Sequence, residues 1–217
     1  MKVDTRLILI FLMILLGGCQ IGKEVKPSEM HPDDLPDERA FQDEFTREFL
    51  QSVEETRPGY YPFLSHTGKY KMDFPRDGHI GKQAYSIRKT NFEFIVGGIS
   101  GTTKAGFTLV FHGENDKANV EDHLNRFKKR IRKDDSDFIK NEGSESAIYH
   151  YHFNRNNFDK NVAYIQNLKS TGGIEIILTV NCATIDNCHK SEADVLHQKF
   201  LNWIKSIKFI NEDESID

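Results

Sequence analysis

The sequence predicts an α+β domain, with a central, mostly antiparallel sheet of about six strands flanked by helices. Three segments repeat apolar residues every three or four positions, which is typical of amphipathic helices. Several others alternate apolar and polar residues, which is typical of strands with one exposed face. After Ala147, turn residues at 154–157 and 172–173 separate three such segments, so we expect consecutive antiparallel strands there.

The first predicted helix covers residues 37–58. An acidic stretch at its start is favourable near the positive end of the helix dipole, and Arg57-Pro58-Gly59 ends it. Its apolar face consists of Phe41, Phe45, Phe49 and Val53. This face either packs on the domain or binds a partner, and packing is favoured because apolar stripes usually face a core.

Two more helices interrupt the strands. The first has an apolar face made of Val120, Leu124, Phe127 and Ile131, with Asp116 or Asn119 as its cap. The second covers residues 191–206. Its buried side consists of Leu196, Phe200, Trp203, Ile204 and Ile207.

The strands follow from alternation with a period of two. Tyr70, Met72 and Phe74 alternate with charged residues before a turn at residues 75–78. Further strands are predicted at residues 83–88, 92–99, 107–112, 147–153, 162–168, 174–180 and 207–210. We therefore expect one globular domain at residues 59–210, preceded by the amphipathic helix.

The composition fits a soluble globular domain, with 38% hydrophobic and 29% charged residues. The net charge of −4 argues against a nucleic-acid partner, which requires a basic surface. Residues 19–36 are polar and contain three prolines, so we expect a flexible tether there. Residues 211–217 form an acidic tail.

The start of the chain resembles the signal of a bacterial lipoprotein. Lys2 and Arg6 precede an apolar run at residues 7–16, which is too short to span a bilayer. Leu16-Gly17-Gly18-Cys19 then resembles the lipobox. The resemblance implies a signal peptide at residues 1–18 and a diacylglyceryl group on Cys19, which anchors the protein to the extracytoplasmic face of a cell membrane. The alternative is a cleaved signal with an incidental cysteine.

The chain has three cysteines, so a lipid on Cys19 leaves an even pair. Five residues separate Cys182 from Cys188, and an exported domain lies in an oxidising compartment, so we expect a disulfide between them. Two alternatives remain open: both thiols are free, or they join His189 in a metal site. A zinc site needs three or four ligands.

Two motifs resemble the PsbP-like family of accessory proteins. One is the strand Gly68-Lys-Tyr-Lys-Met-Asp-Phe-Pro75, and the other is the closing segment Phe200-Leu-Asn-Trp-Ile-Lys-Ser-Ile-Lys-Phe209. The resemblance extends over residues 59–210 and implies an α/β/α sandwich with a role in assembly or docking. Arg76-Asp77-Gly78-His79 departs from the family, which commonly has an aromatic residue soon after Phe-Pro.

A basic run occupies the end of the helix that contains Phe127 and Ile131. One interpretation is a solvated helix end, where cations favour the negative end of the dipole. The other is contact with anionic lipid head groups or cell-wall polymer, where each cation contributes about 1 kcal/mol. The residues concerned are Lys128, Lys129, Arg130, Arg132 and Lys133.

His150 and His152 share one face of a predicted strand, and His112 is a candidate third metal ligand. The favoured interpretation is an exposed sheet face, so we expect no metal. Gly98-Ile99-Ser100-Gly101 lacks the spacing of a nucleophile elbow, and the sequence has no phosphate-binding glycine loop. We therefore expect no catalytic residues and no cofactor.

These observations predict a non-catalytic accessory or interaction module whose partner is an envelope or membrane protein. An alternative is a binder of a small solute or cell-wall polymer, with a pocket on the sheet, although the same aromatic residues are typical of a core. The pocket would be lined by Phe92, Phe94, Tyr149, Tyr151 and Tyr164. A third alternative is an unrecognised envelope hydrolase.

Overall fold

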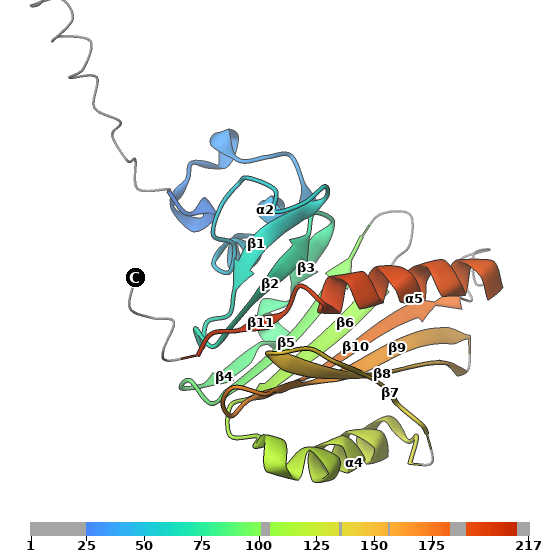
Figure 1. Ribbon diagram of the computed structural model, residues 1–217. Coiled ribbons are helices and arrows are strands. Elements are labelled where there is room, and N and C mark those ends of the chain that lie inside the picture. Colours follow the sequence, from blue (N-terminus) through green and yellow to red (C-terminus); the bar gives the residue numbers. More distant parts are fainter. Residues whose placement is uncertain (1–24, 101–104, 135, 156, 183–189, 212–217) are drawn as a thin grey trace, which may run out of the picture.

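The computed structural model describes residues 25–100, 105–134, 136–155, 157–182 and 190–211. These residues form two antiparallel sheets with helices, which confirms the predicted α+β class (Figure 1). The larger sheet consists of β3 (Gly78–Ile80), β4 (Ser86–Arg88), β5 (Phe92–Ile99), β6 (Ala105–His112), β7 (Ile139–Glu142), β8 (Ser146–Arg155), β9 (Phe158–Asn167) and β10 (Gly173–Asn181). The smaller sheet consists of β1 (Tyr60–Leu64), β2 (Tyr70–Pro75) and β11 (Lys208–Phe209).

The larger sheet has the strand order β3-β5-β6-β10-β9-β8-β7, and β4 pairs with β5 beside β3. Strands β8, β9 and β10 are consecutive antiparallel neighbours, as predicted. The helices are α2 (Arg39–Gln42), α3 (Glu44–Arg47), α4 (Val120–Ile131) and α5 (Lys190–Ile204). Helix α4 covers one face of the larger sheet, whereas α5 and the smaller sheet cover the other (Figure 1).

The strand register assigns side chains to the two faces of the larger sheet, because successive residues of a strand point to opposite faces. One row across the sheet consists of Ile95, Leu109, Ile176, Ala163 and His150. Its four apolar members belong to the main core, under α5 and the smaller sheet. The next row lies on the face that α4 covers and consists of Phe94, Val110, Glu175, Tyr164 and Tyr149.

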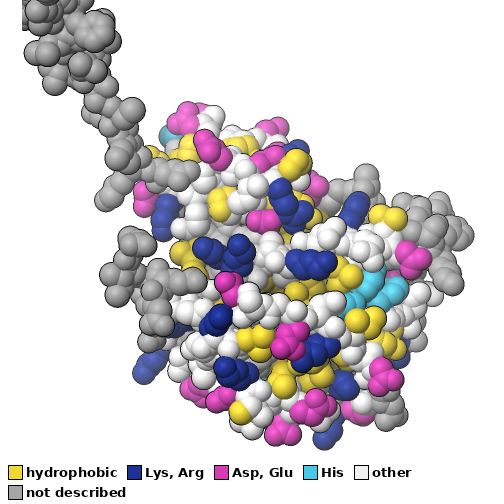
Figure 2. Space-filling view, viewed as in Figure 1, with side chains coloured by type: hydrophobic (Ala, Val, Ile, Leu, Met, Phe, Trp, Pro, Cys, Tyr) yellow, Lys and Arg dark blue, Asp and Glu magenta, His cyan; other side chains and the backbone are white. Residues whose placement is uncertain are grey.

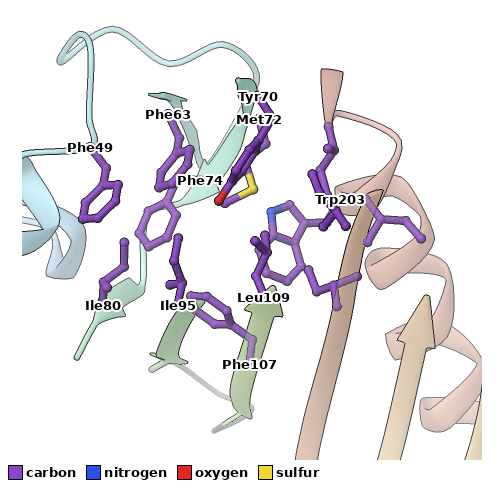
Figure 3. Packing of buried hydrophobic residues seen from close by; sticks show 14 of the residues in the cluster. Phe49, Phe63, Tyr70, Met72, Phe74, Ile80, Ile95, Phe107, Leu109 and Trp203 are labelled. Carbon is purple, nitrogen blue, oxygen red and sulfur yellow. The ribbon is translucent and has the colours of Figure 1, made fainter. Parts of the chain in front are cut away.

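Aromatic side chains fill the main core between the two sheets (Figure 3). Phe63 and Phe74 of the smaller sheet stack with their ring centroids 5.8 Å apart. The indole of Trp203 meets the ring of Phe107 edge to face at 5.5 Å. All four side chains are almost fully buried. Large buried rings dominate the energetics of a core, so this contact holds the smaller sheet and α5 on the larger sheet.

The predicted helix at residues 37–58 is wrong, because α2 and α3 are separate four-residue helices. Asp43 lies between them with an extended backbone, and its Oδ1 accepts hydrogen bonds from the backbone N–H and the hydroxyl of Thr46, at 2.8 and 2.7 Å. A residue that caps the start of α3 in this way cannot continue α2. Phe41, Phe45 and Phe49 are nevertheless buried, so this apolar face packs on the domain.

The predicted tether at residues 19–36 also needs correction. Pro27 is buried in a 3₁₀ turn at Pro27–Glu29, and a second turn covers Pro32–Asp34. Leu35 packs against the main core. The folded domain therefore includes the last part of the expected tether, because these apolar side chains bury surface there. The predicted signal peptide lies outside the described residues, as does the acidic tail except for Asn211.

The sequence pattern does not predict β1, β3 or β7. Strand β1 contains Pro62, which lacks an N–H group and is tolerated because β1 is an edge strand. All four residues of β7 are exposed, so they show no alternation. The strand expected at residues 83–88 is reduced to β4, after a 3₁₀ turn at Lys82–Ala84. A further turn at Lys117–Asn119 precedes α4.

Within the described ranges, none of the helices combines the length and the apolar character that a membrane crossing requires.

Candidate functional site

A cleft of about 440 Å³ lies between α5, the smaller sheet and the end of the larger sheet. Leu178 and Val180 of β10 form part of its apolar lining, together with Phe200 and Trp203 of α5, and all four are at most 6% exposed. Other walls come from the ends of β5 and β6, the start of β1 and the turn between β2 and β3. The volume falls in the range of small-molecule sites, roughly 300–1,000 Å³.

Hydrogen bonds to Asp73 of β2 fix the position of α5 beside this cleft. The indole Nε1–H of Trp203 donates to the Asp73 carbonyl at 2.8 Å, and the Asp73 N–H donates to Ser206 Oγ at 3.0 Å. The Asp73 carboxylate accepts a hydrogen bond from Arg57 Nε at 2.6 Å. The Arg57 guanidinium lies 3.5 Å above the ring of Tyr60, which restricts one wall of the cleft.

Charged side chains form the rim of the cleft. Arg76 pairs with Glu38 at 3.4 Å and with Glu55, and these contacts raise the pKa of Arg76. Two carboxylates therefore balance its charge. Lys199 of α5 is exposed, and no carboxylate of the described residues pairs with it. Lys199 is thus the rim cation that is available to an anionic group of a ligand.

The cleft combines an apolar lining with a polar rim. Burying apolar surface provides binding free energy in proportion to its area, and a few polar groups at the rim orient the ligand. Among the described lining residues the carboxylate of Asp77 is the single acid, and neither histidine nor cysteine is present. The arrangement therefore suits binding of a partly apolar molecule better than acid–base or nucleophilic chemistry.

A group of histidines lies at the surface beside α5 (Figure 2). The ring of His197 on α5 lies 5.4 Å from that of His150 and 5.2 Å from that of His152. His152 Nε2 bonds the buried carboxylate of Asp159 at 2.8 Å, and His197 Nδ1 bonds the side-chain oxygen of Asn161 at 2.7 Å. The Asp159 contact raises the pKa of His152, whereas burial lowers the pKa of His150 and of His197.

The structure confirms that His150 and His152 share a face, but it separates them from His112. His112 lies on the opposite face of the sheet, under α4, because its place in β6 is in register with Gly173 of β10. The candidate metal site made of these three histidines is therefore wrong. In the described part of the chain, no three histidine, cysteine or acidic side chains converge in a way that would hold a metal ion.

The basic run on α4 does not act as one outward-facing surface. Arg130 turns back to the sheet and pairs with Glu175, which is 6% exposed. Lys128 and Lys133 lie over aromatic rings, Phe138 at 5.6 Å and Phe153 at 4.7 Å. Lys129 and Arg132 are exposed, and the side chain of Arg130 is itself 46% exposed. The run is therefore divided between the helix surface and a polar cavity beneath α4, and the contact with an anionic surface stays a prediction.

A buried carboxylate that sequence reasoning misses joins the two sheets. Glu93 of β5 is fully buried and accepts hydrogen bonds from Tyr70 Oη at 2.6 Å, Tyr85 Oη at 2.9 Å and the backbone N–H of His66 at 3.0 Å. Burial, followed by the charge of Glu93, raises the pKa of both tyrosines, so their hydroxyls stay protonated and donate. The sequence feature that could have identified Glu93 is its position in the alternating pattern of β5, where an inward-facing residue is charged.

The five aromatic residues expected to line a pocket share the face that α4 covers. Phe94, Tyr164 and Tyr149 belong to one row of that face. Tyr149, Tyr151 and Tyr164 pack in the apolar cluster beneath α4, and Phe92 lies beside His112 at 5.7 Å. None of the five lines the cleft at α5. The three tyrosines act as core, which is the interpretation that the sequence also favoured, whereas Phe92 and Phe94 are partly exposed.

The cysteine predictions lie mostly outside the described residues. Cys182 is disulfide-bonded, and its position follows the last residue of β10. Cys19 and Cys188 both fall outside the described ranges, so the pairing of Cys182 with Cys188 and the lipid on Cys19 stay predictions.

Comparisons with known proteins agree with a lipoprotein family. A protein of Bacillus subtilis (strain 168), described as "Putative lipoprotein YvcA", is 38% identical over 96 residues, and the alignment covers 39% of this chain and 40% of that protein. A crystal structure from Bacteroides thetaiotaomicron VPI-5482 aligns with 70% of this chain and 49% of its own length. Its TM-score is 0.41 at 11% identity, which is too low to support an argument.

The family model described as "Putative lipoprotein YvcA" matches residues 36–208. This range begins just before α2 and ends in β11, so it includes both sheets, α4, α5 and the cleft. The chain therefore belongs to the family described as "Putative lipoprotein YvcA".

Proposed function

We propose that this chain is a non-catalytic accessory module, anchored through a diacylglyceryl group on Cys19 to the extracytoplasmic face of a cell membrane. The family match to a lipoprotein and the lipobox-like Leu16-Gly17-Gly18-Cys19 support the anchor. The PsbP-like motifs support an accessory role towards an envelope or membrane protein. Two acyl chains give stable anchoring, whereas one gives marginal, reversible binding.

The cleft at α5 is the proposed binding site of this module. We propose that it binds an amphipathic molecule, with an apolar body against Leu178, Val180 and Phe200 and a negatively charged end near Lys199. An anchored protein meets such molecules at the membrane surface. This cleft is therefore the proposed binding site for a small solute, in place of the pocket that the sequence predicts on the aromatic face of the sheet.

Binding in the cleft is expected to change the fluorescence of Trp203, which is the sole tryptophan of the chain and lines the cleft. The probes are decanoate, an amphipathic anion, and decanol, its uncharged counterpart. Leu196→Asp places a charge in the apolar lining and is expected to weaken decanoate binding about tenfold or more, because a buried unpaired charge is costly. The measurement is a fluorescence titration of the domain without its lipid.

Val195→Asp is the matched control, because Val195 is the neighbouring residue on α5, is 53% exposed and does not line the cleft. It is expected to bind decanoate like the parent. Lys199→Gln is expected to remove the preference for decanoate over decanol. Equal losses in the Leu196 and Val195 variants, or no fluorescence change with either probe, would contradict binding in this cleft.

The anchor is tested by Cys19→Ser in cells. The serine oxygen does not accept the thioether-linked lipid, so the variant is expected to move from the membrane pellet to the soluble fraction. Gln20→Ser keeps the thiol, changes the adjacent residue and is expected to sediment like the parent. Fractionation followed by immunoblotting measures both. A Cys19→Ser protein that still sediments fully with membranes would rule out this anchor.

A further inference from the structure

A second cavity, of about 300 Å³, lies under α4 on the face of the larger sheet opposite the α5 cleft. Nitrogen donors dominate its walls: Arg126 and Arg130 come from α4, His123 from the same helix, and His112 from the end of β6. Asn115 completes the wall in the loop that follows β6. Among the wall residues that the structure describes, the single carboxylate is that of Glu175 in β10.

Pairing with Arg130 neutralises the carboxylate in this cavity. Arg130 contacts Glu175, and His112 Nε2 lies 3.8 Å from Glu175 Oε2. Arg126 contacts His123 Nδ1 and has no carboxylate partner among the described residues. With neutral histidines, two guanidinium groups face one carboxylate, so the cavity carries an excess positive charge.

Both histidines of the cavity have a lowered pKa, and burial is the largest cause. Burial lowers the pKa of His112, and the positive charges of Arg130, Arg126 and Arg88 lower it further. Burial and then Arg126 lower the pKa of His123 in the same way. The positive charge of Arg126 therefore adds to the effect of burial at both histidines. A positive potential in a partly enclosed site attracts anions.

The charged and polar residues of this cavity are not needed to attach α4 to the sheet. Leu124 and Phe127 already bury the apolar side of α4 in a cluster with Phe153, Val162 and Tyr164. A buried ion pair contributes little net stability, because desolvation offsets its attraction. One arginine would also suffice to neutralise Glu175. The second arginine and the two histidines around an open volume remain to be explained.

We infer that this cavity binds a phosphoryl group, carried by a free phosphate ion or by a lipid head group, between Arg126, Arg130, His112 and His123. Guanidinium groups match the oxygen geometry of phosphate, and charge-assisted hydrogen bonds are stronger than neutral ones. Lys129 of α4 and Arg132, which follows the helix, are both exposed and favour the approach of an anion. This site is independent of the cleft in the proposed function.

Titration with inorganic phosphate, followed by NMR of the histidine rings, tests the inference. Resonances are assigned with His112→Gln and His123→Gln. Phosphate is expected to shift both rings and to raise both pKa values, because a bound anion stabilises the charged imidazolium. Arg126→Gln is expected to weaken phosphate binding about tenfold, since it removes a hydrogen bond between charged groups. Arg126 is exposed, so this change leaves the fold intact.

Arg132→Gln is the matched control, because it removes the same charge from an exposed position outside the cavity. It is expected to bind phosphate within about twofold of the parent. Glu175→Gln removes the competing carboxylate and is expected to tighten phosphate binding, whereas it would weaken a cation site. Equal losses in both arginine variants, weaker binding in Glu175→Gln, or unmoved histidine resonances would each overturn the inference.

Vesicles separate the two sources of the phosphoryl group. Flotation with phosphatidic acid, compared with phosphatidylcholine alone, measures binding of a lipid head group by the domain without its anchor. If Arg126→Gln no longer floats with the vesicles and Arg132→Gln still does, the site binds the lipid head group. Phosphate binding without flotation assigns it to the free ion. Absence of both kinds of binding would overturn the inference.

Discussion

Trp203→Ala is expected to destabilise the domain by about 3–5 kcal/mol, the usual cost of removing a buried tryptophan. Trp203 is 3% exposed, packs against Phe107 and donates a hydrogen bond to the Asp73 carbonyl. Its loss therefore opens a cavity between the two sheets and leaves a backbone acceptor unpaired. Urea unfolding followed by far-UV circular dichroism measures the effect, because the variant has no tryptophan fluorescence.

Two further variants separate the packing of Trp203 from its hydrogen bond. Trp203→Phe keeps an aromatic ring and loses the N–H group, so we expect a smaller loss, about 1–3 kcal/mol. Val195→Ala, at an exposed position of the same helix, is expected to change stability by less than about 0.5 kcal/mol. A loss below about 1 kcal/mol for Trp203→Ala would show that α5 and the smaller sheet do not depend on this contact.

Glu93→Ala is expected to cost roughly 3–5 kcal/mol, since hydrogen bonds to a charged group contribute about 1.5–3 kcal/mol each. The variant leaves the buried hydroxyl of Tyr70, the hydroxyl of Tyr85 and the N–H group of His66 without their acceptor. It therefore loosens the contacts of β5 with β2, with the residue before β4 and with the turn after β1. Urea unfolding with Trp203 fluorescence measures the loss.

A compensating variant tests whether Glu93 acts through these hydroxyls. Adding Tyr70→Phe and Tyr85→Phe to Glu93→Ala removes the unpaired donors, and replacing both partners of a buried hydrogen bond costs less than removing one. The triple variant is therefore expected to be more stable than Glu93→Ala alone. If the three changes simply add their separate losses, the hydroxyls and the carboxylate are not coupled.

The strands with clear alternation could be predicted from the sequence, because a half-buried strand records its two environments in alternate residues. Residues 92–99 match β5, and α4 agrees with the repeat of Val120, Leu124, Phe127 and Ile131. The same reasoning placed Phe41, Phe45 and Phe49 in one long helix. The side chain of Asp43 decides that local choice by capping α3, which spacing alone does not reveal.

The candidate sites were less predictable, because they join residues from separate elements. Trp203 of α5 meets Asp73 of β2, and Arg130 of α4 meets Glu175 of β10. These contacts depend on the order of the strands and on the face of the sheet that each helix covers. An alternating pattern in one strand specifies neither the strand order nor the face. His150 and His152 share a face by local alternation alone, so that part of the prediction holds. The position of His112 required the register of β6.

The smaller sheet joins an early strand to a late one, which imposes an order on folding. Strand β2 emerges early, yet its second neighbour is β11, where Lys208 pairs with Lys71 and Phe209 with Tyr70. A pairing across such a long stretch of chain forms late, because the intervening loop must first close at an entropic cost. The smaller sheet is thus complete only after β11 has joined β2, so a chain that lacks residues 208–209 would leave one edge of β2 unpaired.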